Sequence, residues 1–200
     1  MRQRLLPRSG YEPKYRGEAW SRDYMIQATH NCYSYFLDDL RKYSRAGKPQ
    51  PGLYSMGPGY ENAITCESIK KRVIADNPRY VITWSLERLY DVCPKGYYKG
   101  FMAINSWGQD YHFYRQDSDG TWSHKPGGTA VSRTDASRQR IYNPLTADRM
   151  YGKRGGIDYD KPCTFFCVRK TRNTKSSGNF MNPKSVNKNP RINLNKNIAK

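Results

Sequence analysis

A tight turn at Asp117-Ser118-Asp119-Gly120 constrains the fold of this chain most strongly. Aromatic and apolar residues recur in 111–116 before it and in 121–125 after it, which is typical of two strands joined as a β-hairpin. A three-residue loop of 118–120 puts Gly120 at the position that needs a positive φ. We therefore expect an antiparallel hairpin in which the length of the loop determines which side chains share a face.

The register of this hairpin brings together two of the chain's three histidines. In the three-residue form Tyr114 lies opposite His124, and His112 falls on the same face as both. A two-residue loop of Asp119-Gly120 would put the histidines on opposite faces, because a slip of one residue reverses the side chains of a strand. We expect the three-residue form.

Cys32 is predicted to lie in the first turn of a helix. Apolar residues recur every three or four positions within 33–43, and Asn31 or Thr29 can cap the preceding turn. Free N–H groups at such a helix end favour a thiolate over a thiol. A buried, chemically inert cysteine is the alternative.

The rest of the chain predicts an α+β fold, with N-terminal helices packed on a small antiparallel sheet. Residues 79–93 are ambiguous between a strand and a short helix, and the continuous apolar run of the last strand suits a central position. The expected helices are 31–44 and 60–76, and the expected strands are 97–105, 111–116, 121–125 and 163–170.

Two basic extensions are expected to flank this domain, which spans 21–170. Residues 1–20 mix Arg, Lys, Pro and Gly without periodicity, and 171–200 hold seven Lys or Arg, eight Asn and no acid. The chain has 35 Lys and Arg against 17 Asp and Glu, a net charge of +18. Such a charge favours polyanionic partners, among them nucleic acid and acidic protein surfaces.

The five cysteines form no recognisable disulfide pattern, because their number is odd and their spacing irregular. No segment approaches the ~20 apolar residues of a membrane span, and the start of the chain lacks a signal peptide's apolar segment. An intracellular, reducing location is therefore expected. Cys163 and Cys167 could bind zinc with the two histidines, but core packing is favoured for them and for Cys66. We expect no metal and no cofactor.

Three motifs resemble a little-characterised group of bacterial and viral proteins, itself similar to the papain-like cysteine peptidase and amidase superfamily. They are Asn31-Cys32-Tyr33-Ser34-Tyr35, the run from Tyr111 to Gly127, and Tyr142-Asn143-Pro144. The resemblance spans roughly 30–170 and implies a papain-like fold. It also implies that Cys32 is the nucleophile, that His112 is the general base, and that His124 orients the ring of His112.

Three functions remain open on these grounds. We favour a thiol hydrolase that cleaves amide or peptide bonds in a protein or peptide substrate. The second is a structural component of a virion, such as a minor capsid or cement protein of a large DNA virus, whose basic tail binds neighbouring capsid subunits. The third is a basic protein that binds nucleic acid.

Overall fold

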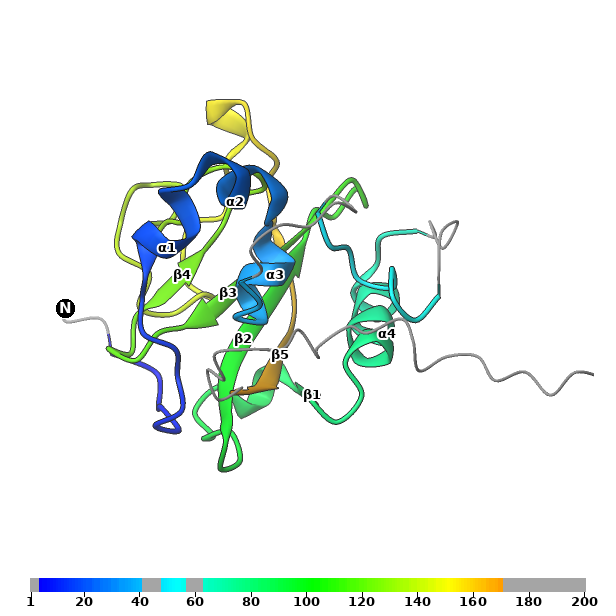
Figure 1. Cartoon of the computed structure of the whole chain (residues 1–200), viewed down its shortest axis with the longest axis vertical. Coiled ribbons are helices and arrows are strands. Elements are labelled where there is room, and N and C mark those ends of the chain that lie inside the picture. The colour runs from blue at the N-terminus through cyan, green and yellow to red at the C-terminus, as the bar shows by residue number, and fades with distance from the viewer. Residues whose placement is uncertain (1–3, 41–47, 57–62, 171–200) are drawn as a thin grey trace, which may run out of the picture.

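The computed structural model describes residues 4–40, 48–56 and 63–170, and it has a mixed α+β architecture (Figure 1). The four α-helices of the described residues precede all five strands in the chain. The helices are α1 (Gly17–Ser21), α2 (Tyr24–Thr29), α3 (Cys32–Phe36) and α4 (Cys66–Asp76). The strands are β1 (Val81–Trp84), β2 (Tyr97–Ile104), β3 (Tyr111–Gln116), β4 (Trp122–His124) and β5 (Lys161–Arg169), and two 3-10 turns lie at Leu86–Arg88 and Gly152–Arg154.

The five strands form one antiparallel sheet in the order β1-β5-β2-β3-β4. The last described strand, β5, lies inside the sheet, as its continuous apolar run predicted. The hairpin of β3 and β4 has the predicted register, because Tyr114 pairs with His124 and the Asp117 N–H donates to the Thr121 carbonyl at 2.8 Å. Gly120 has a φ of 88° in the loop. The three-residue turn is thus confirmed.

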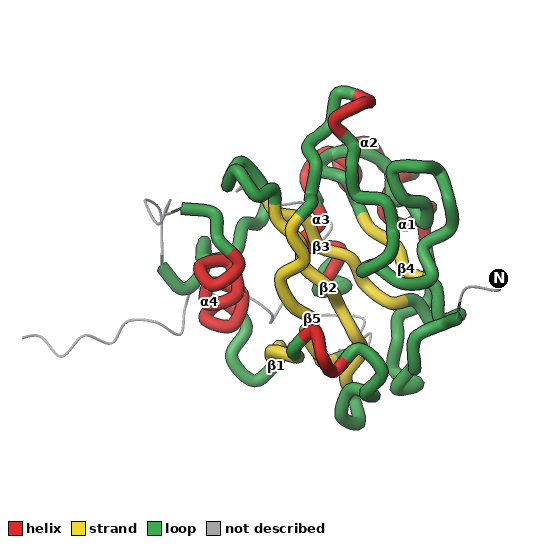
Figure 2. The backbone as a smooth tube through the Cα atoms, turned by 180° about the vertical axis from the view of Figure 1, so that it is seen from behind, coloured by secondary structure: helices red, strands yellow, loops and turns green. Residues whose placement is uncertain are grey.

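Two clusters of apolar side chains form the core, and together they cover both faces of the sheet. The helix α3 lies across β2 and β3 on one face (Figure 1). Seen from behind, the opposite face is covered by loops rather than by long helices (Figure 2). The α3-side cluster includes Cys32, Tyr33, Phe36, Ile69, Val73, Met102, Phe113 and Phe166. The opposite cluster includes Leu6, Phe101, Tyr114, Trp122, Ile141, Phe165 and Cys167.

Both predicted helices are shorter than expected. The first ends at Phe36, because Asp38 adopts a left-handed φ of 52° that no α-helix continues through. Of the two predicted extents, 41–44 and 60–62 lie outside the described residues. The second begins at Cys66, where the Thr65 side chain accepts from the Ser68 N–H and the Ser68 side chain accepts from the Thr65 N–H. This capping box fixes the helix start.

The predicted N-terminal arm is instead part of the domain over its described length, 4–20. Leu6 and Trp20 are buried, and the Gln116 amide donates to the Leu6 carbonyl at 3.0 Å. The apolar residues of 4–20 are widely spaced and only its last residues belong to a helix, the short α1, so the sequence has no periodic pattern that indicates this packing. The predicted tail, 171–200, lies outside the described residues.

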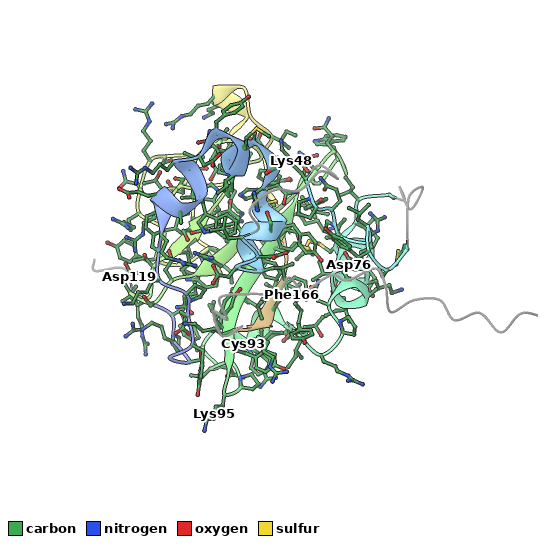
Figure 3. All side chains as sticks on the ribbon, viewed as in Figure 1. Lys48, Asp76, Cys93, Lys95, Asp119 and Phe166 are labelled. Carbon is green, nitrogen blue, oxygen red and sulfur yellow. A yellow bond between two sulfur atoms is a disulfide. The ribbon has the colours of Figure 1, made fainter. Side chains whose placement is uncertain are left out.

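Four of the five cysteines are paired, which overturns the expectation that they are unpaired core residues. The disulfides are Cys66–Cys163 and Cys93–Cys167, with sequence separations of 97 and 74 residues. Both tie β5 to earlier parts of the chain, the first to α4 and the second to the buried Cys93, which lies farther inside the molecule than Lys95 (Figure 3). Partners so far apart in sequence leave no local spacing signal. Within the described ranges no group of three or more His, Cys, Asp or Glu could hold a metal ion, and no helix is long and apolar enough to cross a membrane.

Candidate functional site

His112 and His124 are joined by a hydrogen bond across the β3–β4 hairpin. The Nε2 atom of His112 lies 2.7 Å from Nδ1 of His124, and Nε2 of His124 lies 3.0 Å from the Thr134 carbonyl oxygen. A carbonyl oxygen only accepts, so His124 Nε2 carries a proton and donates it there. In neutral imidazoles His124 Nδ1 is then an acceptor, and His112 donates to it through Nε2. This leaves a lone pair on Nδ1 of His112.

Burial keeps both imidazoles neutral. Loss of solvent lowers the pKa of His124 to about 4. Loss of solvent, and then repulsion from His124, holds the pKa of His112 well below its usual range. Both rings are therefore neutral near pH 7, which is the state that the tautomer assignment requires.

Aromatic side chains fix the ring of His112 in place. It stacks on the ring of Tyr159 with centroids 4.9 Å apart and meets Tyr114 edge-on at the same distance. The Tyr159 hydroxyl in turn donates to Asp110 at 2.9 Å. Nδ1 of His112 has no hydrogen-bond partner among the described residues. The ring thus has one nitrogen bonded to His124 and the other free to act.

Cys32 is the first residue of α3, as predicted. The Asn31 side chain caps this helix by accepting from the Tyr33 and Ser34 N–H groups. Cys32 is only 6% exposed, and burial raises the pKa of its thiol to about 12. The negative charge of Asp110 raises it further, while hydrogen bonding from the Phe113 backbone opposes the rise. The expected stabilisation of a thiolate is absent here, because desolvation outweighs the polar groups of one short helix.

The structure brings the two histidines together but does not bond Cys32 to them. The thiol lies beside the backbone of Phe113, the residue that follows His112. It packs in the α3-side cluster, whereas Tyr114, the edge-on neighbour of His112, belongs to the opposite cluster. Within the described ranges no hydrogen bond joins Cys32 Sγ to either imidazole. In this conformation the sheet therefore separates the thiol from His112 and His124, here called the histidine relay.

Sequence reasoning missed Lys125, the residue after His124. Its ammonium donates to three backbone carbonyls: Gln27 at 2.7 Å, Gly127 at 2.9 Å and Thr129 at 2.7 Å. Burial, with the charge of Lys48, lowers the pKa of Lys125 to about 8, and a Cys32 thiolate would oppose this shift. Lys125 therefore ties the end of the hairpin to the segment that enters α3. The position of Lys125 directly after His124, a candidate catalytic residue, was the one sequence feature that could have indicated it.

Comparisons with known proteins give one informative relative. No family model matches the chain, and no solved structure matches it. Insoluble matrix shell protein 1 of Ruditapes philippinarum is 31% identical over 138 residues, which cover 68% of this chain and 81% of the relative. At this identity and coverage, the chain belongs to the same family as insoluble matrix shell protein 1.

Proposed function

We propose that the protein is a papain-like thiol hydrolase that cleaves amide or peptide bonds. Cys32 is the nucleophile, His112 is the general base and His124 orients the ring of His112. The histidine relay carries this proposal, because the Thr134 carbonyl sets the tautomers of both rings and leaves Nδ1 of His112 unprotonated.

The proposed reaction follows from these roles. The reaction requires Sγ of Cys32 and the ring of His112, which lie on opposite faces of the sheet in this conformation, to come together. Nδ1 of His112 then takes the proton of the Cys32 thiol, and Sγ attacks the carbonyl carbon of the substrate. The resulting imidazolium keeps its Nε2 hydrogen bond to His124, which spreads the new charge toward the Thr134 carbonyl. As the first residue of α3, Cys32 also has an N–H that the helix does not use, and this group is the donor we propose for the oxyanion. His112 then protonates the leaving amine, and water hydrolyses the thioester.

Hydrolysis of peptide p-nitroanilides by the oxidised chain tests this proposal. We expect turnover that is abolished by Cys32→Ser and reduced at least ~100-fold by His112→Ala, because each change removes a reacting group. His30→Ala is the matched control, since the His30 ring donates to the Ile26 carbonyl at 2.8 Å and takes no part in the relay. Turnover that survives Cys32→Ser, or that is absent from every form of the protein, contradicts the proposal.

A structural role in an extracellular matrix is the second candidate. The relative is by name an insoluble matrix protein, and two disulfides of the present chain fit an oxidising compartment rather than a reducing one. The net charge of +18 would attract acidic polymers. A virion is the other setting in which such a basic structural part would serve.

Co-sedimentation with an insoluble acidic polysaccharide distinguishes this role from catalysis. A matrix component should bind the polymer at low salt, lose binding steeply between ~50 and ~200 mM salt, and be unaffected by Cys32→Ser. Binding that is equally strong on double-stranded DNA would favour the nucleic-acid function instead. An absence of binding at low salt removes both.

A further inference from the structure

Residues 48–56, here called the strap, connect the region after α3 to the region before α4. Its flanks, 41–47 and 57–62, lie outside the described residues. The strap forms neither helix nor strand, yet Pro49, Pro51 and Gly52 within it are buried. A short irregular segment with a buried backbone has to be held by specific hydrogen bonds. The strap has such bonds at both ends.

The first set of bonds lies beside the proposed catalytic residues. The Asn31 side-chain amide donates to the Pro49 carbonyl at 2.7 Å, while the oxygen of the same side chain caps α3. The Tyr111 hydroxyl donates to the Gln50 side-chain oxygen. Asn31 directly precedes Cys32, and Tyr111 directly precedes His112. The strap is therefore fastened to the neighbour of each residue that would react.

The second anchor is the buried carboxylate of Asp76 at the end of α4. It accepts from the Gly52 N–H at 2.7 Å, the Ser55 N–H at 2.9 Å and the Ser55 hydroxyl at 2.7 Å. The Tyr33 hydroxyl donates to it at 3.3 Å. Asp76 is 8% exposed, so these bonds replace the water that a carboxylate needs. Releasing the carboxylate would free the far half of the strap.

We propose that the strap is an autoinhibitory segment that shields the Cys32 thiol, and that its displacement exposes the thiol to substrate. In the proposed hydrolase this conformation is the inactive resting state, an interpretation that rests on the proposed function. Its bond to Asn31 places the strap beside the first turn of α3, where Cys32 is only 6% exposed. Displacement breaks hydrogen bonds alone, so the step is reversible and needs no covalent change.

Alkylation of Cys32 by iodoacetamide measures the displacement directly. The other four cysteines are paired, so the oxidised chain has a single free thiol. We expect Asp76→Asn, which removes the charge that holds Gly52 and Ser55, to speed alkylation at least ~10-fold. Gln50→Ala, which removes the bond to Tyr111 at the other end, should act in the same direction. Near-UV circular dichroism checks that each variant is folded, and Ser55→Ala is a milder version of the Asp76 change.

Glu67→Gln is the matched control, because it removes the same charge from α4 at a residue that pairs with Lys70 and Lys71 and not with the strap. Its alkylation rate should stay within ~2-fold of wild type. Unchanged alkylation in both Asp76→Asn and Gln50→Ala overturns the inference. Faster alkylation without any Cys32-dependent hydrolysis supports the strap as a shield and contradicts the proposed hydrolase, so the two failures are distinguishable.

Discussion

The disulfide between Cys66 and Cys163 should be a major source of stability, and its removal is the sharpest test of the fold. It closes a loop across 97 residues of sequence and ties α4 to β5. Chain-entropy arguments give about 4.7 kcal/mol for a loop of this length, and measured losses for native disulfides are about 2–5 kcal/mol. We therefore expect Cys66→Ala/Cys163→Ala to lower the free energy of unfolding by about 3 kcal/mol.

Urea unfolding of the oxidised protein, followed by circular dichroism, measures this loss. For a domain of this size a loss of about 3 kcal/mol also lowers Tm by about 6–12 °C. The remaining bond, Cys93–Cys167, is buried at both ends and should stay intact in the variant. Reduction of the variant should then cost further stability.

Two outcomes would refute the reasoning. An unfolding free energy within about 0.5 kcal/mol of wild type would mean that Cys66 and Cys163 are not bonded in solution. Alkylation in guanidinium without reductant should modify one cysteine per chain, namely Cys32. Modification of three or five cysteines would show that one or both pairs are absent.

Two further predictions test the site and the core. Burial lowers the pKa of His124 to about 4 in the folded protein. Below pH ~6.5 the unfolded chain therefore binds a proton at His124 that the folded chain does not, and stability falls as the pH falls. Between pH 7.5 and 5 this costs about 2 kcal/mol of unfolding free energy, an amount that should vanish in His124→Gln. Burial raises the pKa of Asp117 to about 6, which acts in the opposite direction, so urea unfolding of wild type and variant must be compared at both pH values. An equal change of unfolding free energy with pH in the two proteins would contradict the lowered pKa of His124. Gly100→Ala should lower the free energy of unfolding by about 1–3 kcal/mol, because the added Cβ would overlap the ring of Phe36. Thermal unfolding should show partial recovery of stability in Gly100→Ala/Phe36→Leu. A Gly100→Ala variant as stable as wild type would mean that α3 does not pack on β2 as described.

The hairpin and the sheet could be predicted because their signals are local. The turn at 117–120 required a positive φ at Gly120, and that requirement alone fixed the pairing of Tyr114 with His124. The hydrogen bond between His112 and His124 then followed from the alternation of side chains along the two strands.

Features set by distant contacts could not be predicted in this way. The disulfides join residues 97 and 74 positions apart, and the burial of Leu6 depends on a contact with Gln116 across the molecule. The thiol of Cys32 was expected to be acidic from its helix position. Its pKa is raised instead, because burial depends on packing that no sequence pattern near residue 32 reveals.

The strap was likewise hidden from sequence reasoning. Its Gly and Pro residues predict a loop, and nothing in that composition indicates that the loop is buried. Its hydrogen-bond partners reveal its place in the fold: Asn31 caps α3, Tyr111 begins β3 and Asp76 ends α4.

The most direct test of the central claim is the mass of the protein seconds after mixing with an activated peptide ester. If Cys32 is a nucleophile served by His112, one acyl group should accumulate on Cys32, faster in Asp76→Asn than in wild type, and His112→Ala should form and release it much more slowly. An acyl group that forms equally in Cys32→Ser, or on no residue at all, would contradict the account.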